Sequence, residues 1–156
     1  MILKIIKMIK KILNFKNKQS KTTNKREQNQ MRAILSPDDL KRGDLVEPGW
    51  YPLELVDYTE EPANTDKSTN CIFLFRVFDG KDKGVSPRTQ YNEKALGFGK
   101  NLWAALKLPF DKVKGYELST ELFKSQVGKK IKGYIKRGKS DKGNEFNELK
   151  DFQPIE

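Results

Sequence analysis

The sequence contains no histidine and only one cysteine, Cys71. Without histidine there is no Ser-His-Asp triad, no Cys-His dyad and no zinc site with histidine ligands. A single cysteine excludes an intramolecular disulfide and a metal site built from several cysteines. We therefore expect a protein that is not an enzyme and that holds no cofactor and no metal.

Long apolar runs are also absent. Hydrophobic residues make up 36% of the 156 residues and charged residues 33%, and no uncharged stretch has the length of a transmembrane helix. A membrane span is therefore excluded. Aromatic residues account for 10% of the chain, which suffices for one small core. The length allows one domain with a tail.

Basic side chains outnumber acidic ones by 31 to 21, which gives a net charge of +10. Nine of the basic residues and one of the acidic residues lie within residues 1–30, so the rest of the chain has 22 basic and 20 acidic side chains. A positive charge favours a polyanionic partner such as a nucleic acid. Because the excess lies at the N-terminus, the folded part must bind such a partner through a local group of cations.

Residues 1–30 form a basic extension with two interpretations. Isoleucines at helical spacing, with lysines between them, predict an amphipathic helix followed by a disordered polar linker. Such a helix is typical of a nucleic-acid arm or, as a weaker alternative, of an interfacial membrane anchor. The other interpretation is that Met31 is the start codon and that residues 1–30 are not translated in vivo, because a purine-rich stretch encoding Lys25, Arg26 and Glu27 suits a ribosome-binding site.

The remaining chain is predicted to contain a lead-in and one domain. Residues 31–43 form a lead-in helix and linker, with Ser36 as the helix cap and Pro37 in the first turn. Residues 44–156 form the compact domain. Its hydrophobic periods predict strands at 50–59, 71–78, 84–91, 126–137 and 145–152, and helices at 94–108 and 119–126.

Several side-chain orientations follow from these elements. Period two in the first strand places Trp50 and Tyr58 on the face opposite to Leu53. In the helix 94–108, Phe98 lies on the core face, whereas Trp103 points away from it and either caps the barrel or offers a stacking surface.

The element order is β-β-β-α-β-β when the second, shorter helix is set aside. This is the order of an OB-fold, a five-stranded barrel with a helix between its third and fourth strands. We therefore expect a mainly β, OB-fold-like five-stranded barrel. Another small barrel and an α+β sandwich are the alternatives.

Residues 133–140, GYIKRGKS, match the phosphate-binding pattern G-x-x-x-x-G-K-S. That loop requires a helix to begin at its Lys-Ser pair, so that the helix amides face the phosphates. Here the turn-forming residues 141–144, DKGN, follow instead, and the interior of the pattern is typical of a strand. We interpret the match as a coincidence.

The predicted strand 126–137 carries the clearest candidate site. Its alternation turns Ile131, Gly133 and Ile135 to the core, and the opposite face holds Lys130, Lys132, Tyr134 and Lys136. The following loop adds Arg137, Lys139 and Lys142. Cations beside an aromatic ring are typical of single-strand binding, since cations meet phosphates and rings stack on bases. The alternative is a solvated lysine face that keeps a sheet edge from aggregating.

Other candidate contacts lie on the second and third strands. Arg76 and Phe78 fall on the outward face of strand 71–78, and Arg88 on strand 84–91 extends the groove. The loop 60–70 is net negative, so we do not expect it to bind phosphates. The predicted nucleic-acid-binding residues are thus Lys130, Lys132, Tyr134, Lys136, Arg137, Lys139, Lys142, Arg76, Phe78 and Arg88.

Three segments, PGWYPLELVDYTEE, CIFLFRVFDGKDKG and GKKIKGYIKRGKSDKGNEFNELKDFQP, carry a family resemblance. In their order and spacing, residues 44–156 resemble a phage-encoded family of small proteins of formerly unknown function. That family is regarded as single-stranded-DNA-binding, with an OB-type fold, and is associated with phage replication and recombination genes. The resemblance implies a role in DNA replication or recombination in the cytoplasm of a bacterial host.

Taken together, the residues and the resemblance predict a phage-type single-stranded-DNA-binding protein without sequence preference. The expected partner is single-stranded DNA, with RNA as an alternative ligand, and replication or recombination proteins and a second copy of the chain are further candidate partners. No small-molecule substrate and no membrane partner are expected. The alternative function is a protein-interaction adaptor on an OB-like scaffold in phage DNA metabolism.

Overall fold

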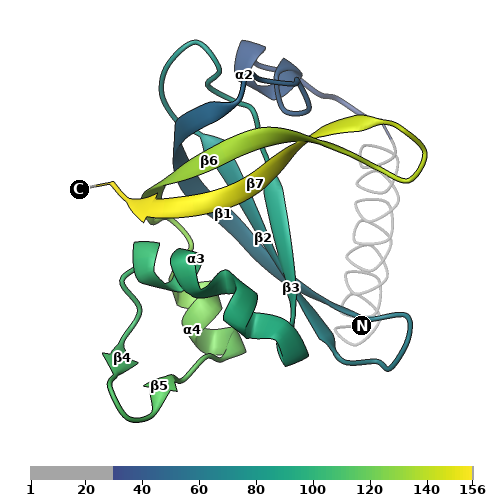
Figure 1. Ribbon diagram of the computed structural model, residues 1–156. Helices are drawn as coiled ribbons and strands as arrows, with labels where there is room; N and C mark the ends of the chain where they lie inside the picture. Colours follow the sequence, from purple (N-terminus) through teal and green to yellow (C-terminus); the bar gives the residue numbers. More distant parts are fainter. Residues whose placement is uncertain (1–29, 156) are drawn as a thin grey trace, which may run out of the picture. The chain divides into compact units, whose positions relative to one another are not determined.

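The computed structural model describes residues 30–155 of the chain (Figure 1). The chain divides into two compact units, residues 1–34 and residues 35–156. Of the first unit, only the exposed residues 30–34 belong to the described part. The predicted amphipathic helix and linker lie outside the described residues.

The second unit is built on one antiparallel sheet of five strands, which confirms the prediction of a mainly β fold (Figure 1). The strands lie in the order β3-β2-β1-β6-β7. Each corresponds to one of the five strands predicted from the sequence. Their bounds are β1 Gly49–Pro62, β2 Thr69–Val77, β3 Arg88–Asn92, β6 Lys130–Lys139 and β7 Glu145–Pro154.

Short helices and a small hairpin occupy the connections. They are the helices α2 Pro37–Leu40, η1 Glu93–Gly99, α3 Lys100–Ala105 and α4 Thr120–Ser125, and the paired strands β4 Phe110–Asp111 and β5 Gly115–Tyr116. The predicted lead-in helix is confirmed as α2, because Ser36 Oγ accepts a hydrogen bond from the Asp39 amide at 3.1 Å. In Figure 1, η1, α3 and α4 lie together at one end of the sheet.

The sheet is not closed into a barrel, so the prediction of a five-stranded barrel is wrong on this point. The lead-in chain before β1 hydrogen-bonds to segments near both edge strands. On one side of it, the amide of Ser86, just before β3, donates to the carbonyl of Arg42 at 2.9 Å. On the other side, the side chain of Asn147 in β7 accepts from the Val46 amide at 3.1 Å and donates to the Asp44 carbonyl at 2.7 Å. The lead-in chain thus joins the segment before β3 to the start of β7.

A β-bulge in β1 changes which face its second half presents. The register between β1 and β2 shifts between Leu55 and Asp57, so Tyr58 pairs with Phe73 and both side chains are buried. The prediction that Tyr58 faces away from the core is therefore wrong. Burial raises the pKa of Tyr58, and its hydroxyl donates to a carboxylate oxygen of Glu60 at 2.5 Å.

The predicted helix 94–108 is broken into η1 and α3, with a non-helical backbone at Ala95 (φ −132°, ψ 31°). Two predicted orientations in this segment are wrong. Phe98 is 86% exposed, whereas Trp103 is buried and stacks on Phe123 with ring centroids 4.9 Å apart. The indole N–H of Trp103 donates to the Leu96 carbonyl at 2.9 Å, so its one polar group is satisfied in the core.

Candidate nucleic-acid interface

The alternation predicted for β6 is confirmed. Ile131, Gly133 and Ile135 are buried, while the opposite face has exposed lysines and a half-buried tyrosine, namely Lys130, Lys132, Lys136 and Tyr134. The buried set packs into the hydrophobic core with β1 and β7. The hydrophobic core therefore holds the register that turns the lysines outward.

The strand beside β6 supplies side chains to the same outward face. In the β1–β6 pairing, Trp50 lies opposite Tyr134, and Pro52 lies opposite Lys132. The rings of Trp50 and Tyr134 meet edge to face, with centroids 5.5 Å apart and planes at 73°. Trp50 is 42% exposed. Trp50 was missing from the predicted site, although period two had placed it on this face.

Phe78, just past the end of β2, joins the group from the far side of β1. Its amide donates to the carbonyl of Pro52 at 3.2 Å, and the ammonium of Lys130 lies 4.7 Å from the centroid of its ring. The outward side chains of three strands thus form one surface, which we call the outer patch and which consists of Trp50, Pro52, Phe78, Lys130, Lys132 and Tyr134.

The lysines of β6 are not neutralised by ion pairs. Within residues 30–155, no salt bridge involves Lys130, Lys132 or Lys136. Acidic neighbours are nevertheless present. Glu54 of β1 lies opposite Lys130, and Glu148 of β7 lies opposite Lys136. This face of β6 therefore combines exposed cations without salt bridges and interspersed acids, and it is not a purely positive surface.

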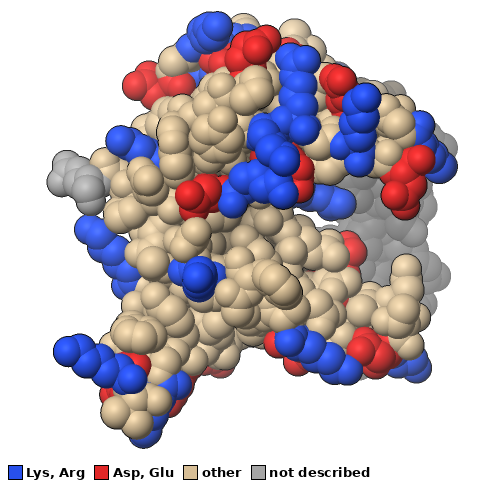
Figure 2. Space-filling view, in the orientation of Figure 1, with Lys and Arg blue, Asp and Glu red and all other residues tan. Residues whose placement is uncertain are grey.

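The cations of the β6–β7 hairpin divide into two sets. Lys139 and Lys142 are exposed at the turn. Arg137 instead points to the lead-in chain and the start of β7, where it lies 3.5 Å from Glu47 and 3.8 Å from Glu145. In Figure 2, Lys and Arg side chains gather over this hairpin with Asp and Glu among them. The fold thus gives Arg137 structural partners and leaves both lysines to solvent.

The remaining predicted residues lie apart from one another. Arg76 is half-buried and pairs with Asp38 of α2 at 3.5 Å, next to the outer patch. Arg88 begins β3, at the opposite edge of the sheet, where it is exposed. It lines a cavity with Phe146 of β7, which was also missing from the predicted site. The structure thus brings Phe78 to Lys130 of β6, engages Arg76 of β2 with Asp38, and places Arg88 at a second location.

The residues 133–140 that match the phosphate-binding pattern run along β6 into its turn. The amide of Ser140 donates to the carbonyl of Asn144 at 2.8 Å, and Gly143 donates back to Ser140 at 2.8 Å. A tight hairpin turn therefore stands where the phosphate-binding loop needs a helix. The interpretation of this match as a coincidence is confirmed.

Other chemistry-bearing groups do not assemble into a reactive site in the described part of the chain. No group of three potential metal ligands occurs among residues 30–155. Cys71 is buried, and burial raises the pKa of its thiol, which keeps the thiol protonated and unreactive. The candidate site is therefore the outer patch with the neighbouring hairpin lysines.

Comparison of the chain with models of known protein families gives no match, and neither does comparison with curated proteins. The resemblance to the phage family therefore stays a prediction. Between residues 30 and 155, no helix combines the length and the apolar character that crossing a membrane requires.

Proposed function

We propose that the protein binds single-stranded DNA without sequence preference, through the outer patch and the lysines of the β6–β7 hairpin. The observation that supports this most is the pair of contacting rings, Trp50 and Tyr134, beside the unpaired cations of Lys130 and Lys132. Rings stack on any base, and lysines contact any phosphate, so such a surface binds without reading sequence.

The strand order supports the same proposal. The order β3-β2-β1-β6-β7, with helices between β3 and β6, is the order of an OB-fold that is open between β3 and β7. OB-folds often bind oligonucleotides, although a fold alone does not define a function. Together with the resemblance of residues 44–156, this extends the proposal to phage DNA replication or recombination.

The test is fluorescence anisotropy of a labelled dT oligonucleotide with the full chain, at two salt concentrations. We expect binding that weakens as salt rises, because displaced counterions return to the strand. The doubly substituted Trp50→Ala/Tyr134→Ala protein should bind more weakly at both concentrations. Its matched control is Phe110→Ala, which removes an exposed ring from β4. Absence of salt-sensitive binding by the parent protein would contradict the proposal.

A second candidate function, a protein-interaction adaptor, is favoured by the β4–β5 hairpin. Val113 at its tip is 93% exposed and Phe110 is 62% exposed. The Asp111 carboxylate accepts from the Val113 amide at 2.7 Å and from the Lys114 amide at 2.9 Å, which shapes the tip in advance of any partner. An adaptor would leave the labelled oligonucleotide unbound in the same assay.

A further inference from the structure

A cavity of about 420 Å³ lies at the open side of the sheet, between β3 and β7. Its volume falls within the range of small-molecule sites. Three stretches line it: residues 42–43 of the lead-in chain, residues 86–88 at the start of β3, and residues 145–147 at the start of β7. The cavity thus lies where the lead-in chain meets the segment leading into β3 and the start of β7.

The walls of the cavity are held together by backbone hydrogen bonds. The Ser86 amide donates to the Arg42 carbonyl at 2.9 Å, and the Phe75 amide of β2 donates to the Pro87 carbonyl at 2.9 Å. Asn147 ties β7 to the lead-in chain through both atoms of its side-chain amide. The backbone segments that carry the lining side chains are therefore held in place before any ligand arrives.

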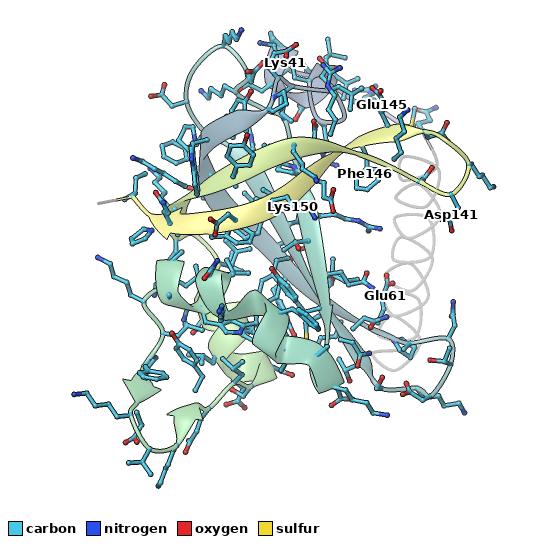
Figure 3. All side chains as sticks on the ribbon, viewed as in Figure 1. Lys41, Glu61, Asp141, Glu145, Phe146 and Lys150 are labelled. Atoms are coloured by element: carbon cyan, nitrogen blue, oxygen red, sulfur yellow. The ribbon has the colours of Figure 1, made fainter. Side chains whose placement is uncertain are left out.

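The ring of Phe146 forms one wall of the cavity. Phe146 lies opposite Gly138 in the β6–β7 ladder. A Cβ atom at position 138 would stand 2.7 Å from Cζ of Phe146, so only glycine lets the ring lie against the strand. Phe146 remains 44% exposed. Figure 3 labels Glu145 and Phe146 at the start of β7, near the hairpin turn. The ring is a preformed stacking surface.

Two guanidinium groups give the cavity its charge. Arg42 and Arg88 both line it, and neither has a salt bridge to any residue between 30 and 155. The one carboxylate in the lining, Glu145, is paired with Arg137 at 3.8 Å. Arginine binds phosphate oxygens through two parallel N–H groups. The cavity therefore offers anion binding and aromatic stacking side by side.

We propose that this cavity receives one nucleotide, with its base on the ring of Phe146 and its phosphate at Arg42 and Arg88. The inference rests on the proposed function, because the nucleotide is taken to belong to a bound single strand. Phe146 and Tyr134 lie on the same face of the β6–β7 ladder, and β6 covers about 13 Å between Tyr134 and Gly138. A strand on the outer patch can therefore continue into the cavity.

A plain anion would use the arginines but leave the ring without a partner, and an apolar ligand would leave two guanidinium groups unpaired. A nucleotide satisfies both. A free mononucleotide has the same chemistry as a nucleotide of a strand, so the experiment includes both forms, as dTMP and as a labelled dT oligonucleotide.

The test compares two full-length variants with two matched controls by fluorescence anisotropy. Arg42→Ala/Arg88→Ala should weaken oligonucleotide binding and lower the salt slope by about 0.7, the value for one lost phosphate contact on a single strand, because both arginines share one phosphate. The control Lys112→Ala/Lys114→Ala removes the same charge from the β4–β5 hairpin. Phe146→Ala should weaken binding roughly five- to a hundredfold without changing the slope, and its control is Phe110→Ala.

A second substitution and a crosslink keep the test independent of folding. Phe146→Leu still covers Gly138 but has no aromatic face, so it should lose affinity at an unchanged melting temperature. A 5-iodo-deoxyuridine oligonucleotide should crosslink to a peptide that contains Phe146. A parent protein that binds the oligonucleotide, together with cavity variants that behave as their controls, would overturn the inference and leave the proposed function standing.

Two other outcomes separate the proposed function from the inference about the cavity. If the parent protein binds neither oligonucleotide nor dTMP, the proposed function and the inference both fall. If it binds dTMP alone, and Arg42→Ala/Arg88→Ala abolishes that binding, the cavity is a mononucleotide site and the strand assignment is overturned.

Discussion

The indole ring of Trp50 and the phenol ring of Tyr134 meet edge to face across two neighbouring strands, with centroids 5.5 Å apart. Edge-to-face contact is a favoured geometry of aromatic pairs, and it restrains each ring. Pro52 and Lys132 follow as the next outward pair. A base that stacks on either ring would therefore meet a surface whose orientation is already set, and both rings belong in any test of binding.

Removal of the Tyr134 ring is expected to weaken oligonucleotide binding by about 1–3 kcal/mol with little change in salt slope, because stacking does not release counterions. Tyr134→Phe should be nearly silent, since the ring stacks and the hydroxyl does not. Trp50→Ala should resemble Tyr134→Ala. Anisotropy at several salt concentrations measures both quantities. Parent-like affinity in a folded Tyr134→Ala protein would show that this face is only solvated surface.

Lysine substitutions, unlike removal of a ring, should change the salt dependence of binding. Each of Lys130→Ala, Lys132→Ala and Lys136→Ala is expected to weaken binding and to reduce the salt slope by about 0.7, the value for one phosphate contact on a single strand. The hairpin lysines, Lys139 and Lys142, should behave in the same way. Lys112→Ala on the β4–β5 hairpin is the control. Slopes that stay at the parent value would exclude these lysines from the interface.

Single strands are expected to bind more tightly than duplexes of equal length. The rings of the outer patch need unpaired bases, whereas a duplex buries its bases in the stack. A competition experiment with a labelled dT oligonucleotide, an unlabelled single strand and an unlabelled duplex measures the preference. Equal competition by both would indicate a general cation surface in which the rings take no part.

Gly99→Ala should destabilise the fold. A Cβ atom at this position would stand 2.5 Å from Cζ2 of the buried Trp103, so the ring or the backbone must shift, at a cost of about 1–3 kcal/mol. For a domain of this size, that lowers the melting temperature by about 2–4 °C per kcal/mol. Gly97→Ala is the matched control in the same helix η1, because nothing lies within 4 Å of its added Cβ. Thermal unfolding followed by circular dichroism compares the two.

The contact between Asp66 and Lys94 makes the stability of the fold depend on pH in the acidic range. Hydrogen bonds from Lys94, at 2.6 Å, and from Ser68 lower the pKa of Asp66 to about 2 from its ordinary 3.8. A lowered pKa in the folded state means that this contact stabilises the fold fully above pH 3.8. The stabilisation is then lost as the pH falls from 3.8 toward 2.

Carboxyl NMR titration should place Asp66 near 2 in the parent protein, and Lys94→Ala should raise that value. An unchanged titration in the Lys94→Ala protein would show that the hydrogen bonds of Ser68 alone hold the pKa down.

The face of β6 was predictable because it depends on a local pattern. Alternating side chains in a strand point to opposite faces, and Ile131 and Ile135 are apolar while their neighbours are three lysines and Tyr134. That contrast identifies both the buried face and the candidate site. Trp50 belonged to a similar pattern, but its contact with Tyr134 depends on which strands are neighbours.

The wrong predictions of side-chain orientation occur where the backbone departs from a regular helix or strand. An uninterrupted α-helical period would have buried Phe98, but the segment is 3-10 helix up to Gly99 and α-helix only from Lys100, and Phe98 is exposed. The bulge after Leu55 moves Tyr58 to the core. A change of helix type or one bulged residue turns a side chain to another face, and nothing in the periods of either segment signals it.

The sequence by itself determined the five strands, the outward lysines of β6 and the absence of histidine chemistry, because these depend on residue type and on the period of neighbouring residues. Only the tertiary structure decided that the sheet stays open and that Arg88 meets Phe146 at a cavity. The cavity depends on the lead-in chain, whose hydrogen bonds to Ser86 and Asn147 join segments far apart in sequence. Such contacts arise only when the core brings distant backbone together, and no local period encodes them.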